Sequence, residues 1–242
     1  MADLSGKVAI VTGASRGIGR AVALRLARDG AAVVINYAAN HDLAAEVVRS
    51  IERNGGTAAA ICADIARRDD IRRLFDETVA RFGPVDIVVN NAGVLSLGEV
   101  ADVTEGDFDR TFAVNVRGAF FVMQESARRL RDGGRIINLS SSVTVHPLPK
   151  TAVYAASKAA VELFTTVLAQ EVGVRGITVN AVAPGGTETD MLTPERAAEL
   201  KRETALRRVG QPADIAAAVA LLAGNDAGWI TGQTIHVDGG QV

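Results

Sequence analysis

The sequence predicts an α/β protein with one doubly wound parallel sheet of about seven strands and helices on both faces of that sheet. Short apolar runs alternate with longer amphipathic segments from one end of the chain to the other. No linker, repeat or low-complexity tract divides the 242 residues, which are enough for one domain with a sizeable core. Small aliphatic residues and glycine dominate, as expected where helices pack closely onto a parallel sheet. We therefore expect residues 1–242 to form one domain.

The elements follow one another in a regular order. Seven apolar runs have the length of strands, at 8–11, 32–35, 58–61, 87–90, 135–139, 178–182 and 234–237. Helical patterns lie between them at 18–29, 42–53, 67–82, 107–131, 152–172 and 212–223. This alternation predicts parallel strands that are joined by right-handed crossovers.

The stretch at 107–131 is long for one helix, and we expect it to bend or break near Asn115 to Gly118. Its apolar residues, together with those of the helix at 152–172, exceed what covering a sheet requires. Such a surplus is typical of a subunit contact. Burial of both helices against the core explains it equally well.

The composition argues against several classes of partner. The formal net charge of −2 provides no basic field for nucleic acid or for an anionic membrane. The first residues lack the basic and apolar segments of a signal peptide, and no apolar run reaches the roughly 18 residues that a membrane span needs. We expect a soluble cytoplasmic protein that binds neither nucleic acid nor membrane.

Metal binding is not expected either. His41, His146 and His236 are scattered without paired ligand spacing, and the chain has one cysteine, Cys62. His146 precedes the helix at 152–172, where it either lines a pocket or is a solvated loop residue. Cys62 lies in an apolar, strand-like stretch and is expected to be a buried thiol.

A glycine-rich turn follows the first strand. It reads TGASRGIGR from Thr12 to Arg20, with Gly13, Gly17 and Gly19 in a GxxxGxG spacing. Glycines let a backbone turn tightly and approach a pyrophosphate, whose charge suits the N-terminus of the following helix. At this place in an alternating α/β chain, the turn predicts a Rossmann-type dinucleotide site in the N-terminal half.

The adenosine ribose of a dinucleotide is expected at the end of the second strand. A carboxylate there would bind both ribose hydroxyls and repel a 2′-phosphate, but this chain has Asn36, Tyr37 and Asn40 with no acid between them. Arg16 in the glycine-rich turn can supply a cation for a 2′-phosphate. We therefore expect NADP(H) to be preferred over NAD(H). If Arg16 is only a solvated loop arginine, either cofactor would bind.

Tyr154 and Lys158 are four residues apart in a helical pattern, so their side chains share one face. A phenol donates its proton readily near neutral pH only if its pKa falls well below about 10. A positive charge about 5 Å away, at an effective dielectric of about 20, favours the phenolate by roughly 3 kcal/mol, or about two pKa units. Taken alone, the pair also fits an amphipathic helix with one Tyr and one Lys on its surface.

Together these segments resemble the short-chain dehydrogenase/reductase family over the whole chain, and above all its branch of β-ketoacyl-acyl-carrier-protein reductases. The matching residues stand in the family's order and spacing. They are the glycine-rich turn, Asp64 and Ile65, Asn90 to Gly93, Asn115, the serines at 140–142, Tyr154 and Lys158, Pro184 and Gly185, and residues 236–240.

The resemblance implies catalytic roles for four residues. Tyr154 would protonate the carbonyl oxygen of the substrate, while Lys158 would lower the pKa of Tyr154 and hydrogen-bond the nicotinamide ribose. Ser141, thirteen residues before the tyrosine and flanked by two further serines, would hold the carbonyl oxygen. Asn115 would position a water that links Lys158 to solvent. It also fits a residue that bonds to backbone at a helix kink, and the two roles are compatible.

The resemblance also implies further contacts with the cofactor. They are Gly13, Ser15, Arg16, Gly17, Ile18 and Gly19 at the phosphates and adenosine, Asp64 and Ile65 at the adenine, Asn91, Ala92 and Gly93 at the riboses, Tyr154 and Lys158 near the nicotinamide, and Pro184, Gly185, Thr187 and Thr189 at the carboxamide. The family often has PGxIxT in the last segment, and here Thr187 replaces the isoleucine. Gly186 beside Thr187 is expected to alter loop mobility or the substrate pocket.

A carbonyl reductase that transfers hydride from NADPH to a ketone is the activity that the resemblance implies, in a homotetramer with a small-molecule carbonyl or alcohol substrate. A 3-oxoacyl thioester is one candidate substrate, and small ketones, sugars and quinones are others. Residues 185–205 would form the substrate loop, with a short, polar, mobile lid from 190 to 205.

An acyl carrier protein as partner would need basic residues near the pocket mouth. Arg128, Arg129, Arg131 and Arg175 are the candidates, and favourable charge at helix C-termini is their alternative role. Two other functions stay open. One is an alcohol or sugar dehydrogenase, and the other is a non-catalytic dinucleotide-binding sensor or scaffold. Loss of Tyr154, Lys158 or the serine would have indicated the sensor or scaffold, and all three are present.

Overall fold

The structure is a computed structural model that describes residues 2–189, 192 and 194–241. Its strands are β1 (Val8–Val11), β2 (Ala32–Tyr37), β3 (Thr57–Cys62), β4 (Ile87–Asn90), β5 (Arg135–Leu139), β6 (Thr178–Pro184) and β7 (Thr234–Val237). They form one parallel sheet in the order β3-β2-β1-β4-β5-β6-β7. The predicted fold class is therefore confirmed.

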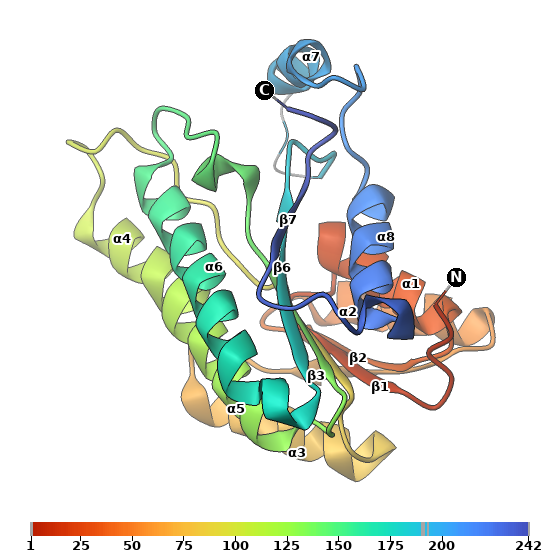
Figure 1. The fold of residues 1–242 in the computed structure, drawn as a ribbon. Helices are drawn as coiled ribbons and strands as arrows, with labels where there is room; N and C mark the ends of the chain where they lie inside the picture. Colours follow the sequence, from red (N-terminus) through yellow and green to blue (C-terminus); the bar gives the residue numbers. More distant parts are fainter. Residues whose placement is uncertain (1, 190–191, 193, 242) are drawn as a thin grey trace.

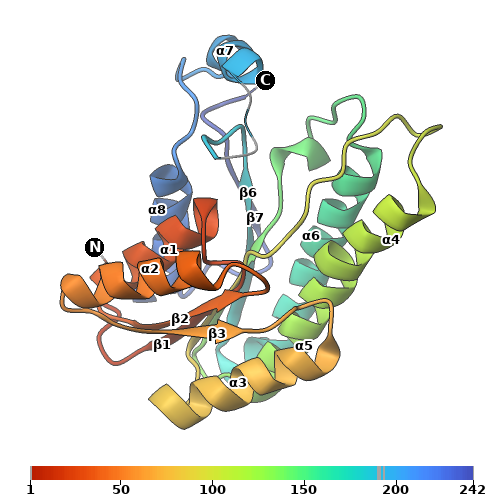
Figure 2. The same cartoon turned by 180° about the vertical axis from the view of Figure 1, so that it is seen from behind.

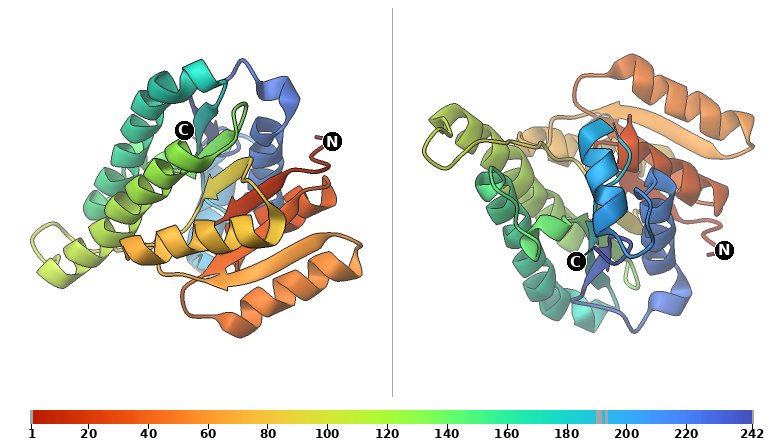
Figure 3. Two further views of the ribbon diagram at one scale, coloured as in Figure 1. Left: turned by 90° about the horizontal axis from the view of Figure 1, so that it is seen from below. Right: turned by 90° about the horizontal axis from the view of Figure 1, so that it is seen from above.

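Helices cover both faces of this sheet. They are α1 (Gly17–Arg28), α2 (His41–Arg53), α3 (Arg68–Phe82), α4 (Glu105–Phe112), α5 (Ala119–Arg129), α6 (Ala152–Val172), α7 (Pro194–Glu203) and α8 (Pro212–Ala223). Figures 1 and 2 show α1, α2 and α8 on one face and α3, α5 and α6 on the other. Figures 1 and 2 also show the helix α7 apart from these layers, beyond the end of β6, and in the view from above it lies in front of them (Figure 3).

Two apolar clusters hold these layers together, because successive side chains of a strand point to opposite faces. In β1, Ala9 and Val11 pack with α1, α2 and α8, whereas Ile10 packs with α3, α5 and α6. All four residues of β1 are buried, as expected for a central strand that is covered on both sides.

The chain reverses its direction of winding across β1. β1 pairs with β2 on one side, with Ile10 opposite Val34, and with β4 on the other, with Ile10 opposite Val88. In open α/β sheets, ligands bind outside the carboxyl ends of the strands at such a switch point. The fold thus places the ends of β1 and β4, and of the neighbouring β5, at one crevice.

The long helical pattern at 107–131 is interrupted as predicted. Between α4 and α5, residues Ala113–Gly118 form a π-helical turn. An added methyl group at Gly118 would lie 2.8 Å from the backbone oxygen of Ile65. The π-helical turn therefore packs directly against the loop that contains Ile65. π-turns inside helices are frequent at functional sites.

Part of the predicted lid is helical. The helix α7 occupies Pro194–Glu203, and the earlier part of the segment includes residues 190, 191 and 193, which lie outside the described residues. Leu200 of α7 is 2% exposed and packs against Gly186, where an added methyl group would lie 2.2 Å from its side chain. Gly186 therefore provides the space that α7 needs to dock.

The expectation that Cys62 is a buried thiol is wrong. Cys62 is the last residue of β3, which forms one edge of the sheet, and it is exposed. Its thiol lies 3.5 Å from the carbonyl oxygen of Ala38. The apolar composition of the stretch predicted the strand correctly, but at the end of an edge strand it does not imply burial.

One helix among the described residues is long and apolar enough to cross a membrane by length and composition alone. This helix, 152–175, comprises α6 and the turn after it, and 28% of its most apolar window is buried. It packs on β6 and contributes Val161, Leu168 and Val172 to the core. Since core helices of globular proteins pass the same test, this is weak support for a membrane span.

Candidate active site

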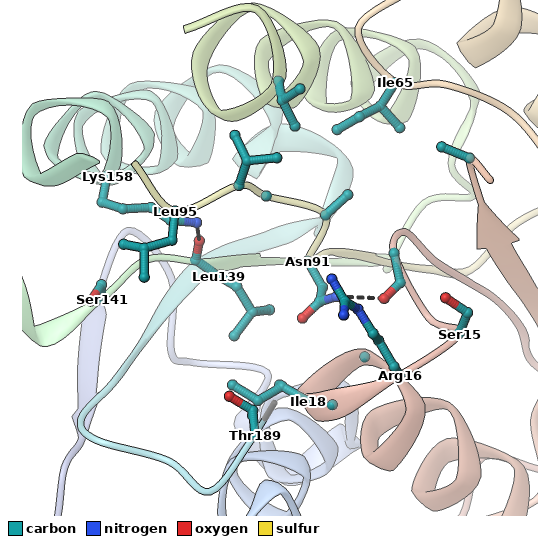
Figure 4. Close-up of a pocket in the computed structure, with 18 of the residues that line it drawn as sticks. Ser15, Arg16, Ile18, Ile65, Asn91, Leu95, Leu139, Ser141, Lys158 and Thr189 are labelled. Carbon is teal, nitrogen blue, oxygen red and sulfur yellow. Dashed lines mark hydrogen bonds between the residues drawn. The ribbon is translucent and has the colours of Figure 1, made fainter. Parts of the chain in front are cut away.

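A cavity of about 680 Å³ opens at the carboxyl ends of the central strands. The predicted site residues that line it are Gly13, Ser15, Arg16, Gly17, Ile18, Gly19, Asn36, Asp64, Ile65, Asn91, Ala92, Gly93, Ser141, Tyr154, Lys158, Pro184, Gly185, Thr187 and Thr189. Figure 4 shows Ser15, Arg16 and Ile18 at one end of this cavity and Ser141 and Lys158 at the other. The cavity is therefore elongated, with the glycine-rich turn and the catalytic candidates at opposite ends.

Two predicted cofactor residues do not line the cavity. Tyr37 is buried in the core on the side of α1 and α2, and its ring meets that of His41 edge-on at 5.9 Å. Asn40 is exposed at the N-terminal end of α2. Because side chains alternate along β2, Asn36 faces the cavity and Tyr37 the core, and the cofactor contacts expected of Tyr37 and Asn40 stay predictions.

Other lining residues were not predicted. They are Ala38, Ala63, Ala66, Val94, Leu95, Arg110, Ala113, Val114, Leu139 and Ser140. Several directly adjoin predicted residues, so strand ends alone could have indicated Ala63 and Val94. Arg110 and Val114 come from α4 and the π-helical turn, and no local pattern shows which face of that segment meets the cavity.

The backbone of the glycine-rich turn forms a compact cradle, in which Gly13 and Gly19 leave no room for a side chain. At Gly19, an added methyl group would lie 2.4 Å from the carbonyl oxygen of Gly13 and 2.5 Å from the side-chain nitrogen of Asn91. Gly13 has φ +62°, and a methyl group there would lie 2.9 Å from Ala92. The turn then opens into the N-terminus of α1, whose free N–H groups attract phosphate. This cradle fits the pyrophosphate of a dinucleotide.

Two asparagines hold that turn in place. The side chain of Asn91 donates hydrogen bonds to the carbonyl oxygens of Thr12 and Gly13, at 2.8 and 3.1 Å. Asn36 accepts from the Gly13 backbone at 3.4 Å and donates to the carbonyl of Ala63 at 2.9 Å. Both side-chain amides therefore fix the shape of the turn by hydrogen bonds to its backbone N–H and carbonyl groups.

Lys158 is buried at the inner end of the cavity and is 5% exposed. Its ammonium nitrogen donates to the carbonyl oxygen of Leu139 at 2.8 Å, at the end of β5. Burial lowers the pKa of Lys158 to about 8 because a charge in a low-dielectric site is poorly solvated. An ammonium group has three N–H donors, so this bond leaves two for other acceptors.

The pKa of Tyr154 is raised, not lowered, in this structure. Burial is the larger cause and favours the neutral phenol, while a hydrogen bond with Ser141 acts in the opposite direction. The nitrogen of Lys158 lies 5.7 Å from the centre of the Tyr154 ring. The pKa of Tyr154 is therefore not lowered in this structure, and Lys158 is not among the causes of its shift.

Asn115 lies in the wall behind the cavity, in the π-helical turn, and is 1% exposed. Its side chain accepts from the N–H of Val94 at 2.8 Å and donates to the carbonyl of Val94 at 2.9 Å and to the hydroxyl of Ser157 at 3.1 Å. A methyl group on Gly93 would lie 3.2 Å from the Asn115 oxygen and 3.4 Å from the Lys158 nitrogen. Asn115 and Lys158 thus converge on one point, and the alternative role of Asn115 as a backbone-bonding residue is observed.

The four arginines considered for a carrier protein lie at the other end of the sheet, next to the starts of β4, β5 and β6. Each meets an acid, in the pairs Arg128–Glu125, Arg129–Asp76, Arg131–Asp86 and Arg175–Asp132. They do not surround the mouth of the cavity. Their places at the ends of α5 and of the turn before β6 support the alternative, favourable charge at helix C-termini.

Metal ligands do not gather in the part of the chain that the structure describes, where no group of three or more His, Cys, Asp or Glu side chains could hold an ion. His146 is half-buried in the loop after β5 and is not among the described residues that line the cavity. Of its two expected positions, the loop position is the one observed.

The fold and the cavity define a dinucleotide-binding α/β protein with a Tyr–Lys–Ser group at the end of its site. The family model described as enoyl-(acyl carrier protein) reductase matches residues 13–241. Tetrahydroxynaphthalene reductase of Pyricularia oryzae is 46% identical over 99% of this chain and 90% of its own length. Versicolorin reductase of Emericella nidulans is 47% identical over 98% of this chain and 96% of its own length.

A solved short-chain dehydrogenase from Burkholderia cenocepacia in complex with NADP is 43% identical and has a TM-score of 0.94, covering 98% of each chain. The chain belongs to the short-chain dehydrogenase/reductase family. It is an oxidoreductase that acts on C=O or CH–OH groups.

Proposed function

We propose that the protein is an NADPH-dependent carbonyl reductase that converts a ketone into an alcohol. The observation that carries this proposal is the placement of Ser141 and Lys158 at one end of a cavity whose other end is the glycine-rich turn. Tyr154 also lines this cavity, and the centre of its ring lies 5.7 Å from the Lys158 nitrogen. A dinucleotide bound with its pyrophosphate on that turn would extend towards the three side chains. The nicotinamide supplies the hydride.

The side chains in this proposal handle the oxygen of the substrate. Ser141 and Tyr154 both present hydroxyls, so both can donate hydrogen bonds to one carbonyl oxygen and polarise it. As the carbonyl carbon gains the hydride, the oxygen takes the phenolic proton of Tyr154. Burial raises the pKa of Tyr154, so the phenol carries its proton at neutral pH. Lys158 stabilises the phenolate that forms, and Asn115 lies where a water could return the proton.

The preference for NADPH over NADH rests on Arg16 and on the lack of a carboxylate at the end of β2. Arg16 lines the cavity at the end where the adenosine belongs, and Asn36 is uncharged. A guanidinium binds phosphate oxygens strongly, and no acid at the end of β2 repels them. The related Burkholderia cenocepacia enzyme was solved with NADP, which supports the same choice.

We propose a ketone of a hydroxylated, fused-ring aromatic compound as the substrate class, in preference to a 3-oxoacyl thioester. Two relatives that match almost the whole chain act, by name, on tetrahydroxynaphthalene and versicolorin. The loops beside the cavity present exposed aliphatic side chains at Leu95, Leu97, Val145 and Leu148, which suit a flat apolar body. The arginines that would have favoured a carrier protein lie at the opposite end of the sheet.

Two measurements test the function. Tyr154→Phe should lower kcat by at least about 100-fold while NADPH still binds, because the phenolic proton is lost and the ring is kept. NADPH oxidation should be followed with fused-ring hydroxylated ketones, simple ketones, quinones and acetoacetyl thioesters. Full turnover by Tyr154→Phe would contradict the proposed proton donor. A higher kcat/KM for thioesters than for any ring ketone would favour 3-oxoacyl thioesters as the substrate class.

We also propose that the chain is a single domain with its substrate loop near 185–205, and that it works in the cytoplasm as a homotetramer. Apolar side chains are exposed on two separate faces, at Leu163 and Val167 of α6 and at Leu221 of α8 and the nearby Trp229. A tetramer with three twofold axes needs two distinct self-complementary surfaces. Sedimentation should give the mass of four chains, and Leu163→Glu should reduce it to two.

A further inference from the structure

Glu162 lies on α6 one turn beyond Lys158, and its carboxylate meets the loop that carries Ser141. One of its oxygens, Oε1, lies 2.5 Å from the Ser140 hydroxyl and 2.9 Å from the Thr144 hydroxyl. An ionised carboxylate can only accept hydrogen bonds, so both hydroxyls donate to it. Two hydroxyls on either side of Ser141 in the chain therefore converge on one oxygen of a side chain that the proposed mechanism does not use.

The loop that carries Ser141 turns directly from β5 into a short 3-10 turn, Ser142–Thr144. Ser141 is the extended residue before that turn, and its hydroxyl accepts from the N–H of Val143 at 3.4 Å. The Thr144 hydroxyl lies 3.0 Å from the carbonyl oxygen of Ser141 as well as close to Glu162. The Thr144 hydroxyl therefore lies between the carboxylate of Glu162 and the backbone of Ser141.

These bonds tie the turn to the helix that carries the proton donor. Tyr154, Lys158 and Glu162 succeed one another at intervals of four residues, so α6 presents them as one row along its face. O–H···O⁻ bonds are short and about twice as strong as bonds between neutral groups. The separation of Ser141 and Tyr154 is therefore fixed by a closed path, through the α6 backbone to Glu162 and back through the Ser140 and Thr144 hydroxyls.

Glu162 is not among the causes of the lowered pKa of Lys158. Burial is the cause of the lowered pKa of Lys158, and the ammonium group is directed to the carbonyl oxygen of Leu139. The polar contacts of Glu162 are instead made with the turn on either side of Ser141.

We propose that Glu162 is a positioning residue for the reduction: it holds the Ser141 turn against α6 so that the Ser141 hydroxyl and the Tyr154 phenol meet one carbonyl oxygen. This inference rests on the proposed carbonyl reduction. Glu162, a half-buried acid on α6, would thus affect kcat without contacting substrate or cofactor.

Steady-state kinetics with saturating NADPH tests the proposal. Glu162→Ala should lower kcat by about 10- to 100-fold, because a misplaced catalytic group costs rate rather than binding. The Kd for NADPH should stay close to that of the unmodified protein, and the variant should stay folded although the loss of two hydrogen bonds lowers its Tm. Glu162→Gln keeps an acceptor oxygen and should recover most of the lost kcat. Glu171→Ala, an exposed acid farther along α6, is the matched control and should leave kcat unchanged.

Serine variants separate this proposal from the proposed function. Ser141→Ala should lower kcat, and adding Glu162→Ala to it should cause little further loss, because Glu162 acts through that serine. If Ser141→Ala is slow but Glu162→Ala is as fast as the unmodified enzyme, Glu162 has no positioning role and the reductase assignment stands. If Ser141→Ala has no effect, the proposed function itself fails.

A second variant covers the case in which Glu162→Ala does not fold. Ser140→Ala combined with Thr144→Val removes both donors and leaves the carboxylate in place. We expect the same loss of kcat from this pair. An unchanged kcat in that folded double variant would overturn the proposal.

Discussion

The ammonium group of Lys158 donates a hydrogen bond to the backbone carbonyl of Leu139 at 2.8 Å, which joins α6 to the end of β5. The bond links the helix that carries Tyr154 to the strand that leads into the Ser141 turn. It also holds a basic group in a site where burial disfavours its charge. Lys158 is therefore expected to cost the protein stability while it serves the reaction.

Replacing Lys158 by Met should stabilise the cofactor-free protein at pH 7 by up to about 3 kcal/mol, less what the lost hydrogen bond contributes. The pKa of Lys158 is about 8 in the folded protein and near 10.5 in the unfolded chain. Unfolding therefore takes up a proton between these values, so the stability of the unmodified protein rises with pH across that window. Urea unfolding at pH 7 and pH 10 should show the advantage of Lys158→Met shrinking at the higher pH.

The exposed Lys201 provides the control for that experiment. Lys201→Met should show no comparable dependence of its relative stability on pH. An advantage of Lys158→Met that is the same at both pH values would contradict the burial of a charged lysine.

Removing the guanidinium of Arg16 should raise the KM for NADPH by about 10- to 100-fold and leave the KM for NADH nearly unchanged. A hydrogen bond to a charged group contributes roughly 1.5–3 kcal/mol, and each 1.4 kcal/mol corresponds to about tenfold. Arg20 lies one turn further along α1 and is not among the described residues that line the cavity, so Arg20→Ala is the matched control. The same ratio of NADPH to NADH efficiency in Arg16→Ala as in the unmodified enzyme would reject the role of Arg16.

Enlarging Gly186 should disturb the docking of α7 and so the substrate site. The methyl group of Gly186→Ala would lie 2.2 Å from the side chain of Leu200, and overpacking of this kind costs roughly 1–3 kcal/mol. We expect the KM for the ketone to rise by about tenfold with little change in the Kd for NADPH. The double variant Gly186→Ala/Leu200→Ala restores the space and should have a lower KM than Gly186→Ala alone. Unchanged kinetics in the single variant would mean that α7 does not need this contact.

The thiol of Cys62 should react in the native protein. Since Cys62 is exposed at the end of an edge strand, one thiol per chain is expected to react with an aromatic disulfide reagent without denaturant. Cys62→Ser should abolish the reaction and change stability by no more than about 0.5 kcal/mol. A thiol that reacts only after unfolding would show that another surface covers it.

Much of the sheet could be predicted because buried parallel strands read as short apolar runs. The strand at 87–90 was predicted to the residue, whereas β6 continues two residues beyond its predicted end, to Pro184. Ala183 and Pro184 pair with His236 and Val237 of β7, and such a pairing is set by a distant strand. A proline also predicts the end of a strand, although it is tolerated where its position needs no N–H for the sheet hydrogen bonds.

The helix α7 was missed although its start carries a signal. Pro194 at the first helical position, followed by helix-forming residues, is a recognised beginning of a helix. The segment buries little, with Leu200 as its one fully buried side chain among the described residues, so its apolar pattern was too weak to indicate a helix. The packing of Leu200 depends on Gly186, which lies fourteen residues earlier in the chain.

The site was predictable where spacing within one element decides it, and not where packing does. Tyr154 and Lys158 share a face of α6 by helical geometry alone. The alternation along β2 also separates Asn36, which lines the cavity, from Tyr37, which packs in the core. By contrast, the presence of Arg110 in the cavity wall depends on the rotation of α4, which no pattern within α4 reveals.

That rotation results from the π-helical turn at Ala113–Gly118, which is equivalent to one inserted residue in a continuous α-helix. Each inserted residue rotates the helix before it by about 100° relative to the helix after it. Shortening the turn by one residue would therefore swing the cavity-facing side of α4 away from the site and leave α5 in its place. The length of this segment matters as much as its composition, so deletions here should be tolerated far less than substitutions of its exposed residues.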